Sequence, residues 1–256
     1  MTQTIYTLAR FSLLEALRTR IGLLALSVLV LGLGISWLAG QVAITETAQI
    51  QAALTASFLR FAAVFILAAF VVISQARESA DKGLDMLLSL PHPRGAYYLG
   101  KLMGFVATGW LLALMFGLPL ILFSPAVNVL PWTISLGLEL SLVAAASLFF
   151  VITLTQVPAA LAALLGFYIL SRAMAALQLI GGSSLIDDQS LAPKIVRWIL
   201  DSIASVLPRL DLFTQSAWLT QSTAPTGLLG NIVVQTVIYV VMLTAAGMID
   251  LHRKNF

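Results

Sequence analysis

Six windows of about 20 apolar residues recur along the chain, and this pattern limits the fold more than any other feature of the sequence. A helix needs about 20 such residues to cross the hydrocarbon core of a bilayer. The windows are 21–40, 52–74, 102–123, 132–155, 158–180 and 226–248. Only Gln156 and Val157 separate the fourth from the fifth, which predicts a tight hairpin. The pattern predicts an all-α polytopic membrane protein with six spans.

The composition makes lipid the solvent for most of the surface. Hydrophobic residues account for 60% of the 256 residues and charged residues for 10%, whereas a soluble domain has about 25% charged residues to cover its outside. There is no cysteine and there are two histidines, which excludes disulfides, thiolate metal sites and a histidine metal cluster. The basic residues that give the net charge of +3 are scattered among the spans. We therefore expect the bilayer, and no nucleic acid, as a partner.

The distribution of Lys and Arg predicts the orientation of the chain. If the N-terminus is inside, nine basic residues fall in cytoplasmic segments and three on the opposite side, which agrees with the positive-inside rule. The nine are Arg10, Arg18, Arg20, Arg77, Lys82, Arg94, Lys101, Arg253 and Lys254, and the three are Lys194, Arg197 and Arg209. We therefore expect a multi-pass protein of the inner, cytoplasmic membrane with both termini in the cytoplasm.

Two segments outside the spans have apolar residues at helical spacing. In the first, residues 1–20, the charged residues Arg10, Glu15 and Arg18 fall outside the positions of the apolar series. That series is Ile5, Leu8, Phe11, Leu14 and Leu17. It predicts an amphipathic helix in the inner interface, either a basic anchor that fixes topology or a surface for a cytoplasmic partner. The second lies in the outer loop, 181–225, where the apolar series is Ile195, Ile199, Ile203 and Val206. It predicts a short amphipathic helix on the membrane.

The predicted cytoplasmic loop 75–101 combines a charged stretch with a short apolar helix, Leu84–Leu90. Pro91 and Pro93 end this helix, because proline cannot continue a helix and restrains the residue before it. A second helix then starts from Arg94 and enters the membrane. A short apolar helix in a cytoplasmic loop needs a partner for its face, either a groove on another protein or the membrane surface.

This loop resembles the loop between the second and third spans of ABC type-2 exporter permeases. The residues that carry the likeness are Glu78, Gly83, Leu87, Leu88, Pro91, Arg94, Tyr97, Gly100 and Lys101. The segment with Arg10, Glu15 and Arg18 looks like the connecting helix of that family, and the basic tail at 251–254 is also similar. Six spans, cytoplasmic ends and a long outer loop before the last span extend the likeness to the whole chain.

The resemblance implies that this chain is the membrane-spanning subunit of an ATP-driven exporter. Its cytoplasmic coupling helix would dock on an ATP-hydrolysing subunit through Glu78, Gly83, Leu84, Leu87, Leu88, Pro91 and Arg94. Two copies of the chain would assemble with two ABC ATPase subunits, and an accessory periplasmic protein would be a further partner. The chain has no G-x-x-x-x-G-K-[ST] sequence. We therefore expect it not to be an enzyme, and expect the partner ATPase to bind ATP and Mg²⁺.

Three charges, Arg60, Glu139 and Arg172, lie inside the predicted spans. Counted from the predicted outer ends at about 1.5 Å per residue, all three lie roughly 10–12 Å below the outer surface. This common depth predicts a network in which Glu139 neutralises one arginine. Intramembrane charges mark functional sites but also serve packing, and arginines also extend toward the interface. Both readings, a packing network and the lining of a transport pathway, are open at this stage.

Two other classes of function compete with the exporter subunit. A secondary transporter working alone would show inverted repeats and broken helices near the midplane, and the sequence has no convincing repeat. An intramembrane enzyme would need an activated nucleophile within the spans. Ser141 and Ser147 lie in the fourth window, but no window supplies a histidine or lysine to activate them.

Overall fold

A computed structural model describes residues 2–42, 46–80, 94–181, 191–220 and 226–253, which hold helices and no strand. The first half contains α1 (Thr2–Arg18), α2 (Ile21–Val42), α3 (Thr47–Ala80), α5 (Arg94–Gly117) and the short 3₁₀ helix η1 (Leu118–Leu122). The second half contains α6 (Ala126–Leu154), α7 (Val157–Gly181), α8 (Leu191–Val206), η2 (Leu210–Leu212), α9 (Ala217–Thr220) and α10 (Thr226–Arg253). The expectation of an all-α fold is confirmed.

Six of these helices, α2, α3, α5, α6, α7 and α10, are long and apolar enough to cross a membrane. They correspond to the six predicted windows, but several begin earlier. Helix α3 starts at Thr47 rather than at residue 52, and α6 at Ala126 rather than 132. Helix α5 starts at Arg94, where the sequence predicts a helix that enters the membrane, and continues into the window that begins at residue 102. A hydropathy window ends where polar residues begin, whereas backbone hydrogen bonds continue past that point. Helix α6 also contains Pro131 in its second turn, where proline has no amide to donate and one backbone hydrogen bond of the helix is not made.

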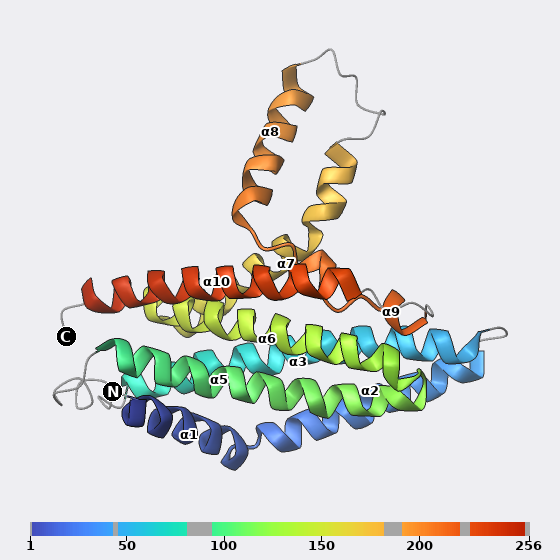
Figure 1. Cartoon of the computed structure of the whole chain (residues 1–256), viewed down its shortest axis with the longest axis horizontal. Coiled ribbons are helices and arrows are strands. Elements are labelled where there is room, and N and C mark those ends of the chain that lie inside the picture. The colour runs from blue at the N-terminus through green and yellow to red at the C-terminus, as the bar shows by residue number, and fades with distance from the viewer. Residues whose placement is uncertain (1, 43–45, 81–93, 182–190, 221–225, 254–256) are drawn as a thin grey trace.

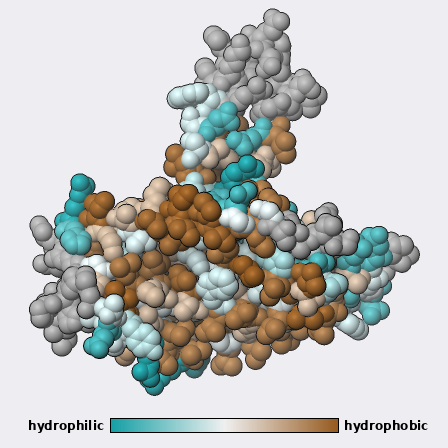
Figure 2. Space-filling view, viewed as in Figure 1, coloured by the Kyte–Doolittle hydropathy of each residue, from teal (hydrophilic) through white to brown (hydrophobic). Residues whose placement is uncertain are grey.

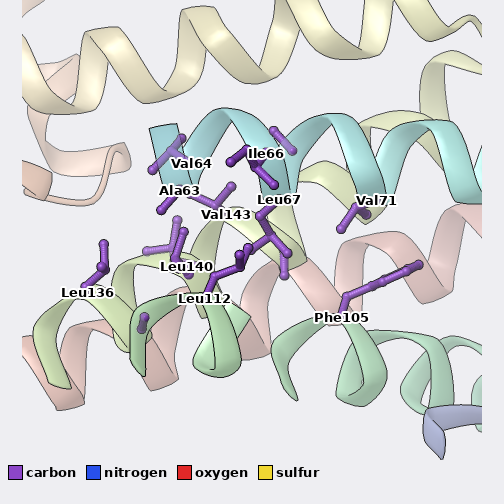
Figure 3. Close-up of a cluster of buried hydrophobic side chains, with 14 of the residues drawn as sticks. Ala63, Val64, Ile66, Leu67, Val71, Phe105, Leu112, Leu136, Leu140 and Val143 are labelled. Atoms are coloured by element: carbon purple, nitrogen blue, oxygen red, sulfur yellow. The ribbon is translucent and has the colours of Figure 1, made fainter. Parts of the chain in front are cut away.

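The centre of the bundle is α6, which packs against α3 and α5. In α6, 78% of the most apolar stretch is buried, whereas the corresponding stretch of α2 is 17% buried. Figure 3 shows Leu67 of α3, Leu112 of α5 and Leu140 of α6 meeting in one layer. Helices α2, α7 and α10 lie at the periphery and are largely exposed, and apolar residues cover much of the face of the bundle that Figure 2 shows.

Small residues let the central helices approach closely. A Cβ atom added at Gly109 of α5 would lie 3.1 Å from the Cβ of Leu140, and one added at Gly137 of α6 would lie 2.7 Å from the ring of Trp110. Since lipid tails are as apolar as Leu, helix association in a bilayer depends on such packing rather than on the hydrophobic effect. The α5–α6 contact therefore depends on van der Waals contact at these glycines.

Both ends of the chain lie at one end of the bundle, where α3 ends and α5 begins (Figure 1). We call it the loop-bearing end, since residues 81–93 join α3 and α5 there. The basic residues in the last turns of α3 and α10 and the first turns of α5 gather at this end; they are Arg77, Arg253, Arg94 and Lys101. Arg10, Arg18 and Arg20 follow along α1 and the α1–α2 turn, which lies farther along the bundle (Figure 1). This clustering is the pattern from which the sequence predicts orientation.

The last part of α7 and helix α8 leave the bundle side by side (Figure 1). The Gln178 amide donates to the Asp201 carboxylate at 3.3 Å and joins the two helices. Helix α8 covers the segment for which the sequence predicts an amphipathic helix, and it exposes Trp198 and Val206. Its placement on a membrane surface stays a prediction.

Helix α1 packs on α5 through small residues on both helices. Gly100 and Gly104 of α5 form a G-x-x-x-G pair, which favours close helix contact in membranes. A Cβ at Gly100 would lie 2.7 Å from the Cβ of Leu8, and one at Gly104 would lie 2.7 Å from the Ala9 carbonyl oxygen. On α1, Ser12 and Ala16 are buried, whereas Phe11 and Leu17 of the predicted apolar stripe are 71% and 64% exposed. Phe11 and Leu17 therefore face outward, whereas Leu8 of the same stripe packs against Gly100 beside the small residues.

We predict that Gly104→Leu separates α1 from α5 and lowers the free energy of unfolding by about 2 kcal/mol, as overpacking of a tight contact does. The measurement is denaturant unfolding of the purified protein in detergent micelles. Gly34→Leu is the matched control, because a Cβ at Gly34 of α2 meets no atom within 4 Å. Equal stability of the two variants would contradict the assigned contact.

Candidate functional site

Glu139 of α6 lies at the centre of a polar network inside the apolar bundle and is completely buried. The Tyr168 hydroxyl donates to Oε1 at 2.8 Å, and Arg172 Nη1 lies 3.3 Å from the same oxygen. The Thr214 hydroxyl donates to Oε2. Three donors from two separate parts of the chain thus surround one carboxylate. A buried charge is tolerated when it is paired and hydrogen-bonded in this way.

The two arginines of the network bind the backbone of one loop rather than extending toward the interface. Arg172 donates to the carbonyl oxygens of Leu210 and Phe213, at 2.9 and 3.1 Å. Arg60 of α3 donates to the Thr214 carbonyl oxygen at 2.9 Å. The planar guanidinium of arginine presents several donors in fixed directions. Here those donors pair with carbonyls of Phe213 and Thr214, and they give the Leu210 carbonyl, which also accepts from the Phe213 amide, a second donor. Backbone groups in an apolar surrounding need such partners.

These carbonyls belong to residues 207–220, which follow α8 and which we call the inserted segment. The Ser135 hydroxyl accepts from the Thr214 amide at 3.0 Å, and the Ser124 hydroxyl donates to the Leu219 carbonyl at 2.7 Å. The hydroxyls of Ser57 and Ser216 lie 2.9 Å apart. Apolar side chains of the segment are buried as well; they are Leu210, Phe213, Trp218 and Leu219. The segment is therefore fastened into the bundle by α3, α6 and α7.

Thr214 makes the most hydrogen bonds between the inserted segment and the helices, and its φ is +47°. A β-branched residue in the left-handed region is strained, because its Cβ approaches the following carbonyl oxygen. Its hydroxyl, amide and carbonyl oxygen are all hydrogen-bonded, to Glu139, Ser135 and Arg60 respectively. Such strained backbone persists where the surrounding contacts over-determine it. The network thus holds this turn in a conformation that the isolated segment would avoid.

The sequence analysis predicts a network of Arg60, Glu139 and Arg172, and the structure brings the three into one cluster. Glu139 pairs with Arg172, while Arg60 joins through Thr214. The sequence analysis missed Tyr168 and Ser135, although each lies four residues before a charged member and therefore on the same helix face. It also missed the inserted segment, since no local pattern shows that a loop enters the bundle.

We predict that Arg172→Gln releases the inserted segment and lowers the free energy of unfolding by roughly 3 kcal/mol, the usual effect of removing one partner of a buried ion pair. Because the chain has no cysteine, a single Leu212→Cys reports access to the segment through its rate of reaction with maleimide. That rate should rise in the Arg172→Gln background. Arg209→Gln is the control, because the Arg209 side chain, which pairs with Asp211, is 56% exposed. Exposed ion pairs contribute little to stability. Equal labelling rates would contradict the fastening role.

A second polar cluster joins α1, α3 and α5 at the loop-bearing end. Lys101 of α5 and Glu78 of α3 form an ion pair with 2.5 Å between Nζ and Oε2, and the Lys101 side chain is only 6% exposed. One turn before Glu78, the Gln75 amide donates to the Tyr97 hydroxyl at 2.9 Å. The Ser74 hydroxyl donates to Glu15 of α1 at 2.7 Å. These contacts fix the helices on both sides of residues 81–93 relative to each other.

The predicted coupling residues fall partly in this cluster. Glu78 is in the ion pair, and Arg94 is the first residue of α5. The predicted helix Leu84–Leu90, with Gly83, Leu84, Leu87, Leu88 and the following Pro91, lies outside the described residues. In the predicted connecting helix, Glu15 accepts from Ser74, while Arg10 and Arg18 are exposed.

We predict that the Lys101–Glu78 pair is energetically coupled. Lys101→Gln should lower the free energy of unfolding by about 3 kcal/mol, because it leaves Glu78 largely buried without its partner. The double variant Glu78→Gln/Lys101→Gln should lose less unfolding free energy than the two single variants lose together, by at least about 0.5 kcal/mol. Denaturant unfolding in micelles measures the cycle, with Arg253→Gln as an exposed control at the same end. Additive effects would show that the two side chains act independently.

In the described part of the chain, no group of three or more His, Cys, Asp or Glu side chains is placed to hold a metal ion. No family model matches the chain, and no curated protein matches it. Fold and site together define a class: a multi-pass, all-α membrane protein with one polar network inside the bundle and another at the loop-bearing end.

Proposed function

We propose that this chain is the membrane-spanning permease subunit of an ATP-driven ABC exporter. It would couple ATP hydrolysis by a separate ATPase subunit to movement of a substrate across the inner membrane. Two copies of the chain would assemble with two ATPase subunits, which bind ATP and Mg²⁺. The loop-bearing end would face the cytoplasm. An accessory periplasmic protein would bind at the opposite side.

The observation that carries the proposal is the bracing of α3 and α5 on both sides of residues 81–93. The Glu78–Lys101 pair and the Gln75–Tyr97 hydrogen bond prevent the two helices from moving independently at that end. A force applied to the loop between them therefore reaches both helices together. Since α3 and α5 both pack on α6, the force reaches the centre of the bundle. This arrangement supports a subunit that is driven by a partner at the loop-bearing end.

Helix α1 supports the same function. Its close packing on Gly100 and Gly104 and its Glu15–Ser74 hydrogen bond connect it to α5 and α3. Its exposed Arg10 and Arg18 are available to a partner. In an exporter subunit, α1 and the loop would form a combined docking surface. The differential contacts of this surface with the open and closed ATPase pair would shift the equilibrium between conformations of the spans.

The Glu139 network would keep the opposite end closed in the resting state. It holds the inserted segment against α3, α6 and α7 through the backbone bonds of Arg60 and Arg172. Substrate exit at that side would require the segment to move, and the ATP-driven rearrangement would supply the free energy to break these bonds. In this proposal the charges line the outer half of the pathway and act as its closure.

The exporter proposal predicts that an ABC ATPase copurifies with the tagged chain and is lost in Leu87→Asp/Leu88→Asp. An acidic side chain cannot occupy an apolar groove on a partner without a large desolvation cost. The readout is pull-down from membranes of the native host, with identification of a subunit that carries a phosphate-binding loop. Val206→Asp is the matched control: it makes the same chemical change at an exposed apolar residue of α8.

The expected result is full ATPase recovery with Val206→Asp and less than about a tenth with the loop variant, which corresponds to a loss of at least about 1.4 kcal/mol of binding free energy. If the wild-type chain transports a substrate in vesicles without any ATPase, the proposal is overturned in favour of a transporter that works alone.

A further inference from the structure

A groove runs between α2 and α3 on the lipid-facing side of the bundle and ends at the α1–α2 turn. Its volume is about 220 Å³, and apolar side chains form its walls. Leu24 comes from α2, and Ile66, Phe70 and Ile73 come from one face of α3. The groove lies along two membrane-spanning helices. Its walls therefore face hydrocarbon rather than water.

The end of the groove nearest the loop-bearing end is polar and basic. Thr19, Ser74 and Arg77 line it together with Glu15. A second hollow shares Glu15 and Thr19 with the groove and extends to Arg18. Glu15 accepts a hydrogen bond from Ser74. Arg20 lies in the turn between the two helices. The groove, the second hollow and the adjoining turn thus hold three exposed arginines and one acidic side chain, which is a local excess of positive charge.

We propose that this groove binds one anionic phospholipid from the leaflet at the loop-bearing end. One acyl chain would lie between α2 and α3, and the phosphate would contact Arg77 and Arg18. The groove is smaller than the roughly 300–1,000 Å³ of a pocket that encloses a whole small molecule, so only part of an acyl chain would occupy it. Guanidinium groups bind phosphate through paired hydrogen bonds, and basic side chains at the membrane surface attract anionic lipids.

Charge complementarity selects an anionic lipid over a zwitterionic one. A zwitterionic headgroup carries a cation beside its phosphate and would meet the same three arginines with no net attraction. The bound lipid would bridge α1, α2 and α3 next to the Glu15–Ser74 hydrogen bond. It would thus steady the position of α1 relative to α3. The proposal holds whether or not the chain is an exporter subunit.

The test is native mass spectrometry of the full chain in detergent, titrated with phosphatidylglycerol or phosphatidylcholine of identical acyl chains. We expect one phosphatidylglycerol per chain, bound at least about fivefold more tightly than phosphatidylcholine, since each arginine near the phosphate contributes about 1 kcal/mol. Arg77→Gln should weaken phosphatidylglycerol binding about fivefold and leave phosphatidylcholine unchanged. The control is Arg253, an exposed arginine at the end of α10. Arg253→Gln should change the binding of neither lipid.

A second pair of variants tests the apolar part of the groove. Ala69 also lines the groove, so Ala69→Phe should fill it and weaken both lipids. Ala245→Phe is the control, because Ala245 is exposed on α10. Equal binding of the two lipids to the wild-type chain, or equal behaviour of Arg77→Gln and Arg253→Gln, would overturn the proposal. Unchanged binding to a folded Ala69→Phe variant would do so as well, and if that variant does not fold, the arginine pair decides the question alone.

Discussion

An ionised carboxylate inside an apolar helix bundle needs donors, and the protein supplies them to Glu139 from distant parts of the chain. Tyr168 and Arg172 reach it from α7, and Thr214 reaches it from the segment between α8 and α10. Arg172 and Arg60 then satisfy carbonyl oxygens of that segment. The segment can lie among the helices only because its backbone groups are paired there. Glu139 therefore joins α6, α7 and the inserted segment, and the bonds from Arg172 and Ser135 to the segment add to this connection.

The two polar clusters suit different tasks. The Glu139 network is deep, joins helices to a loop and holds a strained turn at Thr214. The cluster at the loop-bearing end joins helix to helix through Glu78 and Lys101, with Gln75 and Tyr97 beside them. In the proposed function, the first would keep one end of the bundle closed, and the second would make α3 and α5 move together at the other end. The apolar side chains of α3, α5 and α6 are packed closely (Figure 3), and such packing, which leaves little free space, would transmit displacements between the two clusters.

Helix α1 packs on α5 mainly through small residues, while its largest exposed apolar side chains point away from the bundle. In a soluble protein, the large apolar side chains of such a helix would face the core. Here Phe11 and Leu17 face outward, while Ala9 and Ser12 meet α5 at Gly104. Small residues make the contact because close backbone approach, rather than removal of apolar surface from water, favours helix association in a bilayer. The same arrangement leaves the hollow beside the α1–α2 turn that we assign to an anionic lipid.

The sequence by itself determined the six spans, because hydropathy over about 20 residues depends only on residue type and bilayer thickness. It also grouped Arg60, Glu139 and Arg172, since depth follows from position along a helix. Only the tertiary structure decided what these charges contact. The bonds from Arg60 and Arg172 to carbonyls of residues 210–214 join parts of the chain about 40 to 150 residues apart, and no local pattern encodes such a pairing. For the same reason, the contact of Gly104 with Ala9 and the groove between α2 and α3 arise only when the helices are packed together.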